Sequence, residues 1–170
     1  MHKFGGNMRF NEIKNREQLA DFLKIKNSSL SYILYKLEPK KKYHSFTIPK
    51  KNGETRNIDS PTKMLKDIQR RLLFILSTYY DSVCKENNIK RKVSTAFEKK
   101  KGIYDNARRH VNKKYVVSVD IKNYFPSFNF GRILNYFQKN KYFCLSYDVA
   151  VCISQLVSYN GYLPQGAPTS

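Results

Sequence analysis

The chain opens with two stretches whose apolar residues recur at helical spacing, namely Leu19, Phe22 and Leu23, and then Leu30, Ile33, Leu34 and Leu37. Asn15 can cap the first helix while Gln18 reaches back to it. The second helix is expected to follow Ser28 and to end at Pro39 and the lysines after it. Residues 1–42 are therefore expected to form a helical N-terminal segment.

From Tyr43 the pattern changes to the two-residue alternation of a β-strand. Phe46 and Ile48 alternate with polar neighbours, and an Asn-Gly turn is expected within residues 51–54. Residues 55–58 then continue as a second strand. The pattern predicts a β-hairpin with a basic tip.

Helical spacing returns after the hairpin, with apolar positions at Leu65, Ile68, Leu72 and Ile75. Ser60 offers a capping hydroxyl, and Pro61 is expected at the first helical position. Residues 85–101 are basic and less regular, whereas residues 102–110 again have a helical pattern.

An apolar run from Tyr115 to Val119 ends at Asp120. Such a continuous run predicts a strand that is covered on both faces. Two further helices are expected, capped by Asn129 and Ser146. Their apolar positions are Ile133, Leu134 and Phe137 in the first, and Val149, Cys152, Ile153, Leu156 and Val157 in the second. The fold class is therefore α/β in the broad sense, of the α+β kind.

The net charge of the chain narrows the range of possible binding partners. The chain has 170 residues, and its 32 Lys and Arg against 13 Asp and Glu give a formal net charge of +19. A protein with this imbalance is expected to bind phosphates. Nucleic acid is favoured over a membrane, because the apolar runs are short and the N-terminal residues 1–6 do not resemble a secretory signal. We therefore expect a cytoplasmic protein.

The cysteines and histidines do not suggest a metal site. Cys84, Cys144 and Cys152 form no Cys-x-x-Cys pair, and the three histidines are scattered. All three cysteines are expected to be buried thiols.

Asp120 is the strongest candidate for chemistry. Enzymes that join a nucleotide to a primer use carboxylates to hold two divalent ions, and a carboxylate at the end of a central strand is rigidly held and accessible. A lone Asp in this position is more often a turn former. Phe125, five residues later, would lie against the sugar of a nucleotide, where a flat ring clashes with a ribose 2′-hydroxyl. Considered alone, Phe125 would be assigned to the core.

Four segments together resemble retron-type bacterial reverse transcriptases. VSVDIKNYFPSF and LPQGAPTS resemble the first catalytic motif and the Gln-Gly motif of that family. Residues 46–69 resemble its fingers hairpin and helix, and residues 106–110 fit its Asn-Ala-x-x-His signature. The resemblance implies an RNA-directed DNA polymerase with a helical N-terminal segment (1–42), fingers (43–114) and a partial palm (115–170).

The resemblance also implies roles for residues of the catalytic motif. Asp120 would be catalytic and would bind Mg²⁺, with help from the carbonyl of Ile121, and Phe125 would select deoxyribose. Asn106 and His110 would either brace the fold or contact RNA, and a structural role is the favoured interpretation.

Residues of the hairpin and of the Gln-Gly motif would bind the nucleotide. Arg56 would grip the triphosphate with its forked guanidinium, assisted by Lys50 or Lys51. The alignment does not choose between the two lysines. Gln165 and Gly166 would lie under the nascent base pair, where a glycine permits close approach.

The family's Tyr-x-Asp-Asp hairpin, which supplies further carboxylates, is not found in these 170 residues. We therefore expect this polypeptide alone not to polymerise DNA. The missing carboxylates would come from a C-terminal half or from a second polypeptide, and an apolar surface would be left uncovered without them.

The expected partners are a structured non-coding RNA as template and primer, deoxynucleoside triphosphates and the DNA product, with a role in antiphage defence. A different interpretation is a non-catalytic basic RNA-binding module in which Asp120 is structural. A basic ribosome-associated protein is a weaker third possibility.

Overall fold

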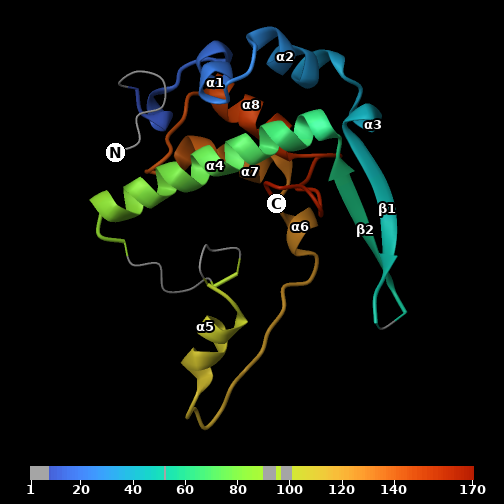
Figure 1. Ribbon diagram of the computed structural model, residues 1–170, viewed down its shortest axis with the longest axis vertical. Coiled ribbons are helices and arrows are strands. Elements are labelled where there is room, and N and C mark those ends of the chain that lie inside the picture. Colours follow the sequence, from blue (N-terminus) through green and yellow to red (C-terminus); the bar gives the residue numbers. More distant parts are fainter. Residues whose placement is uncertain (1–7, 52, 90–94, 97–100) are drawn as a thin grey trace.

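The computed structural model describes residues 8–51, 53–89, 95–96 and 101–170 (Figure 1). Within these residues, helices pack beside a single two-stranded antiparallel sheet, so the α+β class is confirmed. The expectations for residues 1–6, for Asn52 in the turn and for much of the basic stretch 85–101 fall outside the described residues. Among the helices that are described, none has the length and apolar character needed to cross a bilayer.

The N-terminal segment is helical as predicted. Asn15 Oδ1 accepts a hydrogen bond from the Gln18 amide at 3.0 Å, and Gln18 Oε1 accepts one from the Lys14 amide at 2.7 Å. This cap starts α1. Pro39 begins a short helix of its own, because a proline lacks only a donor that the first helical turn does not use. The elements are a 3₁₀ turn (Phe10–Glu12), α1 (Arg16–Phe22), α2 (Asn27–Ser31), a π-helical turn (Tyr32–Lys36) and α3 (Pro39–Lys42).

The predicted hairpin is also present. Its strands, β1 (Tyr43–Pro49) and β2 (Thr55–Pro61), pair in antiparallel register from Tyr43 opposite Pro61 to Pro49 opposite Thr55. The prediction that Ser60 and Pro61 start the next helix is wrong. Both lie in β2, where a proline is tolerated because each strand of a two-stranded sheet is an edge strand.

A long helix, α4 (Lys63–Glu86), crosses the body in front of α8 (Tyr147–Val157) in the view of Figure 1. The four apolar positions predicted for it are all buried. At one point α4 is tied to the end of α1, because the Arg71 guanidinium donates to the carbonyls of Leu23 and Lys24 at 3.1 and 2.7 Å. The N-terminal segment and α4 therefore belong to one hydrophobic core.

Two C-terminal helices, α7 (Phe130–Lys139) and α8 (Tyr147–Val157), complete that core. Asn129 caps α7 as predicted, accepting from the Arg132 amide at 2.9 Å. Ser146 does not cap α8 with its side chain. Its hydroxyl instead donates to the carbonyl of Lys14 at 2.8 Å and so joins α8 to the segment before α1.

Residues 101–122, here called the arm, extend away from the body (Figure 1). The arm carries α5 (Ile103–Ala107) and a 3₁₀ turn (Arg108–His110), which confirms the predicted helical stretch. The predicted strand from Tyr115 to Val119 is wrong for this structure. These residues pair with no strand in the described part of the chain, and Val117 and Val119 are 82% and 87% exposed. An apolar pattern encodes a tendency to be covered, but a strand also requires a neighbour for its backbone.

One cysteine expectation is corrected. Cys84 and Cys152 are buried, whereas Cys144 is exposed. Cys144 lies between α7 and α8 with a φ of 43°, flanked by Phe143 and Leu145, which are both buried. The turn that directs these two neighbours into the core leaves Cys144 outside.

Candidate functional site

Basic and apolar side chains of the hairpin line a hollow of about 430 Å³. Arg56 lies opposite Ile48 in the strand register, and Ile58 lies two residues further along β2 on the same face. The whole lining consists of Ile48, Pro49, Lys50, Lys51, Arg56 and Ile58. The hollow thus combines three cationic side chains with an apolar floor, which suits a ligand that carries both phosphate and apolar surface.

The two lysines at the tip of the hairpin differ in their ion pairing. Lys50 Nζ lies 2.8 Å from Glu54 Oε2, and the Lys50 amide donates to the Glu54 carbonyl at 2.7 Å. Lys51 is exposed and forms no ion pair within the described residues. The charge of Lys50 is therefore partly neutralised in place, while that of Lys51 faces solvent.

The segment with Gln165 and Gly166 packs directly on β2. The Asp59 amide donates to the Gln165 carbonyl at 2.8 Å, outside the register of the hairpin itself. Gly166 has a φ of +116°, and a Cβ there would lie 2.7 Å from Ile58 Cγ2 and 3.3 Å from the Asp59 carbonyl oxygen. This contact with β2 gives a reason within the fold for a glycine at position 166.

Two buried polar residues beside this contact were not predicted as site residues. Asp59 accepts a hydrogen bond of 2.6 Å from the Ser45 hydroxyl across the hairpin. Gln69 of α4 donates to the Tyr43 hydroxyl at 2.8 Å. Burial, opposed by the Gln69 hydrogen bond and supported by the nearby Asp59 charge, raises the pKa of Tyr43 to about 12. Gln69 interrupts the apolar stripe of its helix, and this is the signal by which the sequence could have identified it.

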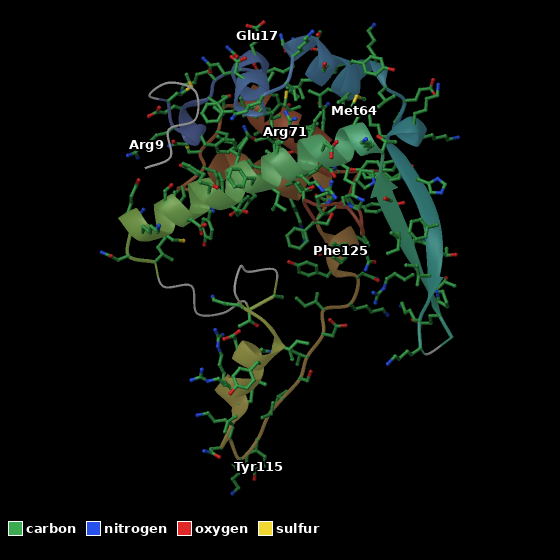
Figure 2. All side chains as sticks on the ribbon, viewed as in Figure 1. Arg9, Glu17, Met64, Arg71, Tyr115 and Phe125 are labelled. Carbon is green, nitrogen blue, oxygen red and sulfur yellow. The ribbon has the colours of Figure 1, made fainter. Side chains whose placement is uncertain are left out.

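Phe125 lies on α6 (Tyr124–Ser127), between the arm and the body (Figure 2). It is half-buried, and its ring meets that of Tyr124 edge to face at 5.6 Å. The next residues join the Gln165 segment, because the Leu163 amide donates to the Phe128 carbonyl at 2.9 Å. The structure thus brings the turn that carries Phe125 to the loop that carries Gln165.

Asp120 and Ile121 lie in the arm, where both are exposed. Asp120 forms no hydrogen bond or ion pair within the described part of the chain. Asn106 and His110 are exposed as well, so the bracing role favoured for them has no buried contact to support it. Figure 2 shows Tyr115, at the start of the apolar run, at the far end of the arm.

Comparison with known proteins agrees with the motifs. No protein-family model matches the chain. The chain is 25% identical over 160 residues to the retron Ec86 reverse transcriptase of Escherichia coli, an alignment that covers 93% of this chain and 46% of the relative. It is 29% identical over 179 aligned positions to the retron Mx162 reverse transcriptase of Myxococcus xanthus, covering 94% and 35%. A third relative, the retron Se72 reverse transcriptase of Salmonella heidelberg, is 28% identical over 142 residues, covering 84% and 32%.

The chain therefore spans less than half of the length of these curated relatives. The matches nevertheless run along most of the chain rather than along a single motif. The resemblance inferred from the four segments is confirmed, and the chain is related by sequence to the retron-type reverse transcriptases.

Proposed function

We propose that this chain forms the fingers and part of the palm of an RNA-directed DNA polymerase that copies a structured non-coding RNA. The observation that carries the proposal is the joining of the basic hairpin hollow to the Gln165–Gly166 loop, in a chain related to reverse transcriptases over 93% of its length. The division into residues 1–42, 43–114 and 115–170 is part of this proposal.

The hollow on the hairpin is the proposed site of the triphosphate. Arg56 presents a planar fork that can hold two phosphate oxygens at once. Lys51 is the better placed of the two lysines to assist, because Glu54 already holds Lys50 at 2.8 Å. The side chains of Ile48 and Ile58 would lie beneath the rest of the nucleotide.

The loop and α6 would bind the rest of the substrate. Gln165 and Gly166 are proposed to lie under the nascent base pair. Phe125 is proposed to exclude a ribose 2′-hydroxyl by the bulk of its ring. Support for both roles comes from the backbone link between Leu163 and Phe128, which keeps these two segments together.

A magnesium site is supported only in part. Mg²⁺ binds one or two carboxylates and completes its shell with phosphate and other oxygens, and Asp120 with the Ile121 carbonyl could supply two such oxygens. A pair of metal ions needs more carboxylates than that. No group of three or more His, Cys, Asp or Glu gathers among the described residues, so these residues alone do not fit a two-metal site.

The remaining carboxylates are proposed to come from a further part of the polymerase or from a second polypeptide. The same part would cover residues 115–119 and turn them into a palm strand, since an extended apolar segment gains backbone partners in that way. RNA is proposed to contact the arm near Asn106 and His110, where Arg108, Lys113 and Lys114 are also exposed. A role in antiphage defence rests on the family resemblance alone.

Primer extension by the full-length protein that contains this chain tests the proposal, with Mg²⁺, deoxynucleoside triphosphates and an RNA template. Asp120→Asn should reduce DNA synthesis to the level without enzyme while leaving RNA binding intact. Asp21→Ala, an exposed carboxylate on α1, serves as the matched control and should retain activity. Full synthesis by the Asp120 variant would contradict the catalytic role of Asp120, whereas RNA binding without DNA synthesis by the wild-type protein would favour a non-catalytic RNA-binding module.

A further inference from the structure

Gln69 is a polar side chain at the centre of the apolar core. It is 0% exposed and lies on the buried face of α4, next to Ile68 and three residues before Leu72. An apolar side chain of the same size would fill this position without the cost of removing an amide from water. A glutamine is stable at this position only if hydrogen bonds offset the cost of its burial.

The Gln69 amide nitrogen joins two segments that are far apart in the sequence. It donates to the Tyr43 hydroxyl at 2.8 Å and to the Leu156 carbonyl at 2.8 Å. Tyr43 is the first residue of β1, and Leu156 lies in the last turn of α8. Gln69 Oε1 is buried without a hydrogen-bond partner among the described residues, which costs folding free energy. The two hydrogen bonds of the amide nitrogen are therefore the feature that a glutamine provides at this position.

Two sets of contacts connect the base of the hairpin, where Tyr43 and Asp59 lie, to the loop that carries Gln165. The Tyr43 ring stacks on that of Tyr159, with centroids 4.4 Å apart. Tyr159 and Tyr162 then exchange backbone hydrogen bonds of 2.9 and 3.1 Å, which form the turn before the Gln165 loop. From the other side, the Asp59 amide donates to the Gln165 carbonyl. The base of the hairpin and the loop are thus held at two separate places.

We propose that Gln69 is a positioning residue that fixes the base of the hairpin against the Gln165 loop, and with it the placement of Arg56 relative to that loop. This rests on the proposed function, because the placement matters for a nucleotide bound between the two. Gln69 itself lies in the core and does not touch the substrate. Its effect reaches the site through Tyr43 and the carbonyl of Leu156.

Gln69→Leu separates positioning from simple packing, because leucine fills the position but forms neither hydrogen bond. In the 170-residue chain, we expect a retained helical spectrum and exchange of the Asp59 amide hydrogen that is about tenfold faster or more. In the full-length protein, the KM for deoxynucleoside triphosphate should rise about tenfold, with kcat changed far less, as expected when a binding group is displaced. Gln138→Leu, at a half-buried position on α7, is the control and should change neither quantity.

Unchanged Asp59 exchange together with an unchanged KM in Gln69→Leu would overturn the proposal. If Gln69→Leu does not fold, Tyr43→Phe provides the second variant, since it removes one of the two bonds and keeps the one to Leu156. It should produce the same changes at smaller size, and their absence would also overturn the proposal. If the wild-type protein does not polymerise, the proposed function fails, and the exchange of Asp59 alone decides whether Gln69 holds the hairpin to the loop.

Discussion

The hairpin with the Gln165 loop and the arm both carry residues of the proposed active site, but in the described part of the chain only the hairpin and the loop are held in place by contacts within the body. At the hairpin base, Asp59 bonds to Gln165, and Tyr43 is held by a buried amide and a stacked ring. In the arm, Asp120 and the apolar residues before it are exposed to solvent. The proposed substrate-binding side is therefore assembled by this chain, whereas the proposed metal-binding side is not.

The two regions differ because, among the described residues, only the hairpin base has packing and hydrogen-bond partners within the body of the chain. The hairpin base contacts α4 through Tyr43 and the loop after α8 through Asp59, so its polar groups meet others from the same chain. The arm offers a row of apolar side chains and backbone groups with no strand of the described residues beside it. A surface of this kind is suited to pairing with another strand.

Truncation of a buried side chain in the body should lower the free energy of unfolding more than any other change considered for the two regions. Leu72 in α4 is fully buried, so Leu72→Ala should lower the free energy of unfolding by about 2–5 kcal/mol. Val117→Ala in the arm should change it by less than about 0.5 kcal/mol, because Val117 is 82% exposed. Urea denaturation of the 170-residue chain measures both values. Equal losses in the two variants would show that the arm is packed in solution.

The hairpin and loop should lose stability at high pH through Tyr43. Burial raises the pKa of Tyr43 from 10.0 to about 12, so the folded chain keeps a proton that the unfolded chain releases above pH 10. This contribution to stability is complete below pH 10 and is lost as the pH rises from 10 to 12, with a size of roughly 3 kcal/mol. Denaturation across this range should show a steeper loss for the wild type than for Tyr43→Phe. Equal slopes would argue that Tyr43 is not buried in solution.

A side chain at position 166 tests the contact between loop and β2. Gly166→Ala should destabilise the chain by about 1–3 kcal/mol, because alanine disfavours a φ of +116° and its Cβ would meet Ile58 at 2.7 Å. Gly131→Ala in α7 is the matched control. Its Cβ has only an ordinary contact of 3.5 Å, and an alanine in a helix stabilises by at most about 1 kcal/mol. A neutral Gly166→Ala would mean that the loop does not lie on β2 as described.

The smallest effect is expected at the tip of the hairpin. Lys50 and Glu54 form an exposed ion pair, so Glu54→Gln should lower stability by only about 0.2–1 kcal/mol, and less at high salt. Thermal denaturation at low and high ionic strength measures this. A larger, salt-independent loss would indicate that Glu54 supports the turn through contacts other than its charge.

Periodicity in the sequence was enough to predict most helices and the hairpin. The apolar positions of α4 and α8 and the cap by Asn129 were all predicted, because these features depend on near neighbours in the chain. The predictions for Ser60, Pro61 and the strand ending at Val119 were wrong. The length of β2 and the pairing of the arm depend on distant segments, which local patterns do not encode.

The candidate site was predicted to a different extent in its two halves. Family motifs identified Arg56, Gln165 and Gly166, and the structure places these residues in two segments that contact each other. The motifs did not identify Gln69 or Asp59. The bond from Gln69 to Leu156 spans 87 positions, and no local rule pairs residues at such a separation.

Hydrogen exchange of the 170-residue chain, followed residue by residue, tests the difference between the two regions most directly. The amides of Asp59 and of the buried face of α4 should be strongly protected, because they are hydrogen-bonded within the packed body. The amides of Val117, Val119 and Asp120 should exchange at rates close to those of an unstructured peptide. Protection of these arm amides equal to that of Asp59 would contradict the account, since it would show that this chain assembles both sides of the site by itself.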